Sequence, residues 1–145
     1  MPTCRVVVIL AALCGAGSVG AQAADTLADA VSFHRDVCIQ PYYAEKSESA
    51  LYDEMIAAGM AEPFLARLAV GAPANWRPLA DTGVPVRERL TGAIGLVGMA
   101  ISHGNPREKA VAAAYSAYFI PVPDDGACAL PEGLAEYVAQ HDFWQ

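Results

Sequence analysis

Apolar residues recur at spacings of three and four along most of the chain, which is the pattern of helices that bury one face. In residues 27–39 the apolar positions share a face, and Thr26 is placed to cap the first free N–H groups of a helix. Pro41 is expected to end this helix, because the residue before a proline avoids helical backbone angles. The same spacings predict further helices over residues 50–58, from about Pro63, over residues 106–118 and over residues 131–141.

The most apolar of these segments outside the N-terminus is residues 86–102. After Arg89 it is apolar nearly all round, which is typical of a helix surrounded by other helices. Gly92, Gly95 and Gly98 are poor helix formers and leave a β-strand open at this point. The predicted fold is therefore all-α, a small bundle of about five to six short helices around this central hydrophobic helix, with an α+β fold as the alternative.

The N-terminus has the layout of a secretory signal. Arg5 precedes an apolar run over residues 6–13, and the run is too short for a bilayer, which takes about 20 residues. Small residues follow, and the Ala-Gln-Ala of residues 21–23 fits a signal-peptidase site. We expect residues 1–23 to be removed and residues 24–145 to form one exported domain, periplasmic or secreted. An uncleaved N-terminal anchor is the alternative.

Two cysteines remain after removal of the predicted signal, Cys38 and Cys128. In an oxidising compartment they permit a single intramolecular pairing. No C-x-x-C motif suggests redox chemistry instead. The sequence therefore predicts a structural disulfide that joins the first helix to a late loop.

The chain is acidic, with sixteen Asp and Glu against nine Lys and Arg and a net charge of −7. Loss of Arg5 with the signal makes this −8. Such a surface disfavours nucleic acid and anionic lipid as partners and suits a cationic protein, although acidity also serves solubility. After signal cleavage no segment is long and apolar enough to span a membrane.

A copper site is the principal cofactor alternative. His34 precedes Cys38 by four residues, and Met99 precedes His103 by four, so each pair projects to one side of a helix. A thioether and imidazoles suit copper, which gives His34, Met99 and His103 as candidate ligands. Since the predicted disulfide removes Cys38 as a thiolate, we expect no resident cofactor.

No catalytic residue is assigned. The chain lacks the nucleophile elbow, the H-E-x-x-H zinc motif and a phosphate-binding glycine loop. Its neighbouring acids fall on predicted helix surfaces and turns, where carboxylates are usually solvated. An enzyme of unrecognised type would use His34, His103 or His141 as its base.

Large aromatic residues fall in predicted loops or at the chain end, where binding residues are common. Trp and Tyr are also frequent anchors of protein interfaces. We therefore expect a non-enzymatic binding module of inhibitor, immunity or accessory type that engages another protein. Copper handling and service as an accessory subunit of an envelope complex are the alternatives. The candidate contact residues are Tyr42, Tyr43, Trp76, Phe143 and Trp144.

Overall fold

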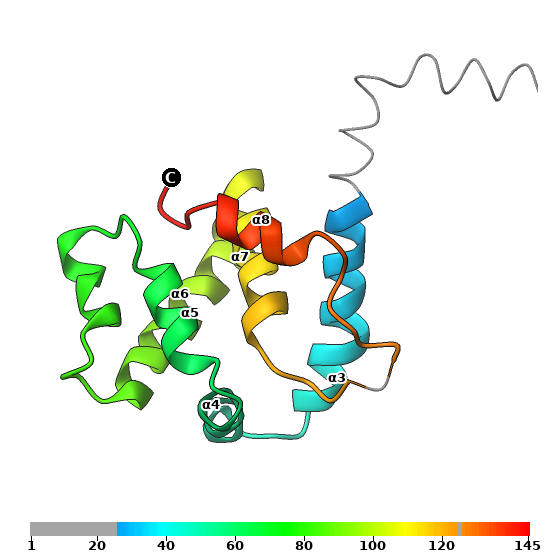
Figure 1. The fold of residues 1–145 in the computed structure, drawn as a ribbon, viewed down its shortest axis with the longest axis horizontal. Coiled ribbons are helices and arrows are strands. Elements are labelled where there is room, and N and C mark those ends of the chain that lie inside the picture. The colour runs from blue at the N-terminus through cyan, green and yellow to red at the C-terminus, as the bar shows by residue number, and fades with distance from the viewer. Residues whose placement is uncertain (1–25, 125) are drawn as a thin grey trace, which may run out of the picture.

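The computed structural model describes residues 26–124 and 126–145, and the predicted signal peptide, residues 1–23, lies outside them. Every regular element in the described part is a helix, so the all-α prediction is confirmed (Figure 1). None of these helices is long and apolar enough to cross a membrane. In chain order they are residues 26–34, the π-helix η1 (Arg35–Ile39), α3 (Gln40–Tyr43), α4 (Glu48–Ala57), α5 (Ala61–Leu68), the 3-10 helix η2 (Ala74–Ala80), α6 (Val86–His103), α7 (Pro106–Phe119) and α8 (Leu134–Gln140).

The first helix runs without a break over residues 26–43, so Pro41 does not end it as predicted. Proline lacks an N–H group, and its ring collides with the carbonyl four residues earlier in a regular α-helix. Here the preceding turn widens into η1, where the N–H of Gln40 donates to the carbonyl of Arg35, five residues back. The wider turn makes room for the proline ring at the start of α3.

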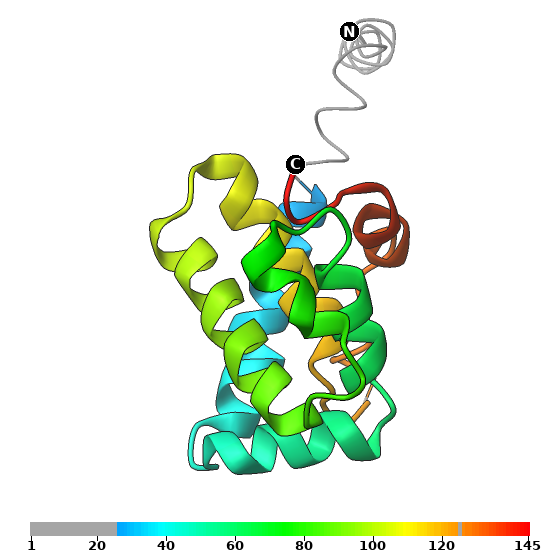
Figure 2. The ribbon, with the colours of Figure 1, turned by 90° about the vertical axis from the view of Figure 1, so that its left-hand side faces the viewer.

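The most buried helix of the bundle is α7, not α6 as the sequence suggested. Figure 1 shows α7 between the first helix on one side and α5 and α6 on the other, and Figure 2 shows α4 lying across one end of the bundle. On α6, Met99 is 61% exposed. The buried residues of α7 come from nearly its whole circumference: Val111, Ala112, Ala114, Tyr115, Ser116, Ala117 and Phe119.

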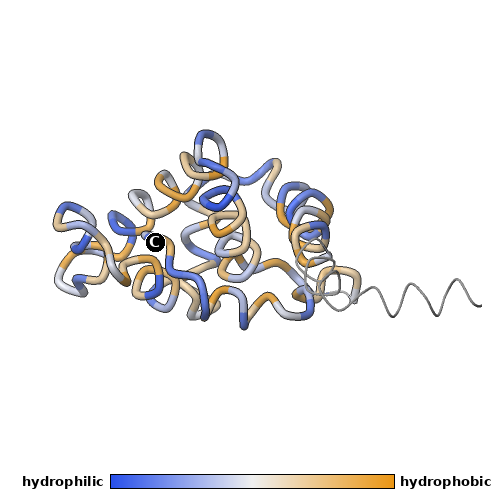
Figure 3. Tube along the Cα trace, turned by 90° about the horizontal axis from the view of Figure 1, so that it is seen from above, coloured by the Kyte–Doolittle hydropathy of each residue, from blue (hydrophilic) through white to orange (hydrophobic). Residues whose placement is uncertain are grey.

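The start of α7 is fixed by the capping pair that its sequence encodes. The side-chain oxygen of Asn105 accepts from the backbone N–H of Glu108 at 2.9 Å, and Glu108 accepts from the N–H of Asn105 at 2.8 Å. Pro106 occupies the first turn, where a missing N–H costs nothing. Hydrophilic and hydrophobic residues are mixed along the helices, and neither kind gathers at one end of the molecule (Figure 3).

The C-terminal tail is docked on the body. The indole Nε1 of Trp144 donates to the carbonyl of Leu68 at 2.8 Å, and the ring centroid of Phe143 lies 6.1 Å from that of Tyr115. The hydroxyl of Tyr115 in turn donates to the carbonyl of His141 at 2.6 Å. These contacts hold the tail against α5 and α7.

The predicted disulfide between Cys38 and Cys128 is present. It joins the π-helical turn of the first helix to the loop between α7 and α8, and it closes a segment of 90 residues. On chain-entropy grounds, closing a loop of that length stabilises the fold by up to about 4.6 kcal/mol.

Candidate functional site

The five aromatic residues predicted as partner contacts all have contacts within the chain. Tyr42 and Tyr43 lie on α3, not in a loop; the hydroxyl of Tyr42 donates to Glu54 at 2.6 Å, and that of Tyr43 to the carbonyl of Pro121 at 2.5 Å. The Trp76 and Trp144 ring centroids are 6.2 Å apart. Each of the five, Phe143 included, keeps part of its surface exposed, so their role as partner contacts stays a prediction.

The hydrogen bond to Glu54 raises the pKa of Tyr42, and burial together with the same carboxylate raises the pKa of Tyr43 well above its usual value. Both phenols are therefore neutral at physiological pH. A neutral phenol can donate a hydrogen bond, as Tyr42 does to Glu54 and Tyr43 does to the carbonyl of Pro121.

The three candidate copper ligands divide between two cavities. Met99 and His103 line one of about 300 Å³ beside Trp144 and the C-terminus, whereas His34 lines another, beside Cys128. Cys38 is held in the disulfide and supplies no thiolate. Within the described residues, no three His, Cys, Asp or Glu side chains come close enough to hold a metal ion.

His34 is buried deeply, at 2% exposure, and its Nε2 atom has no hydrogen-bond partner. Burial lowers its pKa, because a charged imidazolium is poorly solvated there. The side chain is therefore neutral at pH 7. It lines a cavity of about 260 Å³ whose other walls are mostly apolar.

Arg89, in the first turn of α6, is a buried cation. It is 4% exposed and binds both carboxylate oxygens of Glu62 at 2.7 Å, as well as the backbone carbonyls of Val84 and Leu79. The hydrogen bond from Arg89 lowers the pKa of Glu62. A signal was available, because Arg89 lies four residues before Ala93 on the face that α6 buries.

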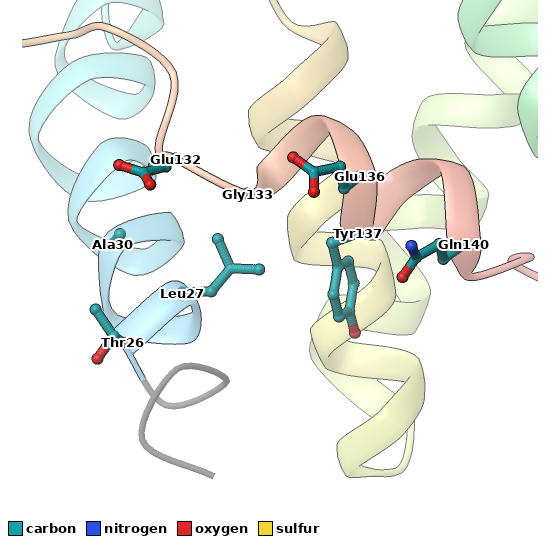
Figure 4. A pocket seen from close by; sticks show the side chains of 8 residues that line it. All are labelled: Thr26, Leu27, Ala30, Glu132, Gly133, Glu136, Tyr137 and Gln140. Atoms are coloured by element: carbon teal, nitrogen blue, oxygen red, sulfur yellow. The ribbon is translucent and has the colours of Figure 1, made fainter. Parts of the chain in front are cut away.

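Two neighbouring cavities flank the start of the first helix. In the first, of about 680 Å³, Leu27 extends from the first helix toward Tyr137 of α8, and Glu132 and Glu136 supply two carboxylates (Figure 4). Glu132 and Glu136 are both exposed. The acidic character of this cavity disfavours anions.

The second cavity, of about 420 Å³, shares Leu27 and Tyr137 with the first. It lies between the first helix and α7, and its charged residues are Arg35 and Lys109. Two cavities of opposite charge thus meet at Leu27 and Tyr137. Sequence reasoning missed this arrangement, since it depends on which helices become neighbours.

Comparison with known proteins adds no identity, since no family model, curated protein or solved structure matches this chain.

Proposed function

We propose that this chain is a non-enzymatic binding module, exported to the periplasm or secreted, that engages another protein through the outer face of its first helix. The observation that carries the proposal is a pair of large apolar side chains on that face. Phe33 is 56% exposed and Val37 is 48% exposed, one turn apart. The same helix already buries Val31, His34 and Cys38 on its inner face, so packing of the domain does not account for the outer pair.

Charge on this face favours a cationic partner. Asp29 and Asp36 lie four residues before and three residues after Phe33, and both are exposed. Neither forms an ion pair with another described residue. An aromatic anchor with acidic neighbours suits a partner surface that combines an apolar pocket with Lys or Arg side chains. The net charge of −7 acts in the same direction by steering a cationic partner toward the chain.

The test is affinity capture from an envelope extract of the producing cells with the wild-type chain and with Phe33→Ser/Val37→Ser. We expect a basic protein that the wild type retains and the double variant loses. The matched control is Ile56→Ser/Val70→Ser, which changes two other exposed apolar residues, at 39% and 44% exposure, and is expected to retain the partner. Retention of the same proteins by Phe33→Ser/Val37→Ser contradicts the proposal, provided that thermal melting shows both variants folded.

A further inference from the structure

The cavity between the first helix and α7 has an apolar floor and wall. Ala110, Ala113 and Ala114 of α7 face Leu27 and Val31 across it. Alanine side chains are short and fill little of the space between two helices, and a groove of about 420 Å³ lies here. That volume lies within the range of about 300–1,000 Å³ common to small-molecule sites.

The charges on this groove are unusual for so acidic a chain. Most described Lys and Arg side chains have a partner: Lys46, Arg67, Arg87 and Arg89 pair with carboxylates, and Arg107 binds carbonyl groups of the C-terminal tail. Among the Lys and Arg residues within 26–124 and 126–145, those whose side chains form no ion pair or hydrogen bond are Arg35, Arg77 and Lys109. Two of these three cations, Arg35 and Lys109, line the same apolar groove.

Local backbone geometry adds a second observation. Arg35 is the first residue of the π-helical turn that accommodates Pro41. Single π turns inside α-helices are rare and are frequent at functional sites. In this chain the turn begins at the cation that lines the groove and also carries Cys38, whose disulfide holds this part of the first helix in place.

We propose that this groove binds an anionic amphiphile with one acyl chain, of the fatty-carboxylate class. The acyl chain lies along the alanine floor, and the carboxylate pairs with Arg35 and Lys109, while Ser32 supplies a hydroxyl donor at the same groove. The carboxylates of Glu132 and Glu136, beyond Leu27 and Tyr137, disfavour a second anion on that side and so direct the headgroup to the basic cavity.

The first experiment is calorimetric titration of the purified chain with decanoate, below its micelle-forming concentration. We expect a single site whose affinity falls about tenfold or more in Arg35→Gln/Lys109→Gln, since two charge-assisted hydrogen bonds are lost. Arg77→Gln removes the remaining unpaired cation, outside the groove, and is expected to bind as the wild type does. Decanol, which keeps the acyl chain and lacks the charge, is expected to bind about tenfold more weakly than decanoate.

A second variant tests the location. Ala110 is exposed and lines the groove, so Ala110→Leu fills space there without disturbing the core and is expected to weaken decanoate binding severalfold. Unchanged affinity in this variant or in Arg35→Gln/Lys109→Gln overturns the proposal, as does equal binding of decanol. Binding to phosphatidylglycerol vesicles without binding of monomeric decanoate also overturns it, because a membrane surface is then the ligand. Phe33→Ser/Val37→Ser is expected to leave decanoate affinity unchanged, which separates this site from the protein-binding face.

Discussion

Helices α6 and α7 follow each other in the chain and pack side by side, but they differ in which of their residues are buried. α6 carries Ile, Leu, Val and Met side chains, yet it buries only Arg89, Leu90, Ala93 and Val97. α7 is rich in alanine and buries residues on nearly every side. Because the alanine side chains of α7 are short, neighbouring helices can approach it closely from several directions. The larger side chains of α6 keep neighbours farther away, and α6 is packed on one face. Position in a bundle thus follows from close approach as much as from hydrophobicity.

The largest expected effect comes from the centre of α7. Tyr115 is fully buried, contacts Phe119 and Phe143, and donates its hydroxyl to the carbonyl of His141. We expect Tyr115→Ala to lower the free energy of unfolding by about 3–5 kcal/mol, because it leaves a cavity and an unpaired carbonyl. The measurement is urea denaturation followed by circular dichroism.

Met99 on α6 supplies the matched control, since it is also large but is 61% exposed. Met99→Ala is expected to change the free energy of unfolding by less than about 0.5 kcal/mol, in line with other surface positions. Similar losses in Tyr115→Ala and Met99→Ala would contradict the assignment of α7 as the centre of the bundle.

The next effect concerns the buried cation of α6. Arg89→Met keeps an unbranched apolar stem and removes the guanidinium, which leaves the carbonyls of Val84 and Leu79 without this donor. We expect a loss of about 1–3 kcal/mol in the free energy of unfolding, measured by the same denaturation. Arg87→Met is the control, because the Arg87–Asp53 ion pair is exposed and such pairs contribute little.

The ion pair between Arg89 and Glu62 makes the free energy of unfolding depend on pH. Hydrogen bonding to Arg89 holds the pKa of Glu62 below its ordinary value of 4.5. The stabilisation is therefore complete above pH 4.5 and is lost as the pH falls through the lowered pKa of the folded state. Glu62→Gln should remove this part of the acid sensitivity. An identical decline in wild type and Glu62→Gln would show that other carboxylates dominate.

Features formed within one helix could be predicted from the sequence, whereas features that depend on which helices pack together could not. Asn105 and Glu108 form a capping box because both partners lie within one turn, and the pairing of Cys38 with Cys128 required only that two cysteines remain. The π turn before Pro41 depends on the helix being held on both sides of the proline, which periodicity does not reveal. The basic groove likewise needs Arg35 and Lys109 from separate helices, so no pattern in either segment predicts it.

The last expected effect, a gain in stability, lies on the exposed face of α6. A Cβ atom at Gly95 or Gly98 would meet no atom within 4 Å, so alanine fits there without strain. Each of Gly95→Ala and Gly98→Ala is expected to raise the free energy of unfolding by about 0.5–1 kcal/mol, because alanine has less backbone entropy to lose in a helix.

Gly104, just beyond the end of α6, gives the opposite sign. A Cβ atom there would lie 2.5 Å from the carbonyl oxygen of Ala100 and 2.7 Å from Cβ of Glu108, so Gly104→Ala forces the junction with α7 to shift. Thermal melting of the three variants is the measurement. Stabilisation by the two α6 variants and destabilisation by Gly104→Ala would show that α6 is free on its outer face and constrained where it meets α7. Destabilisation by Gly95→Ala or Gly98→Ala would mean that this outer face is packed against something in solution, and the contrast between the two helices would then fail.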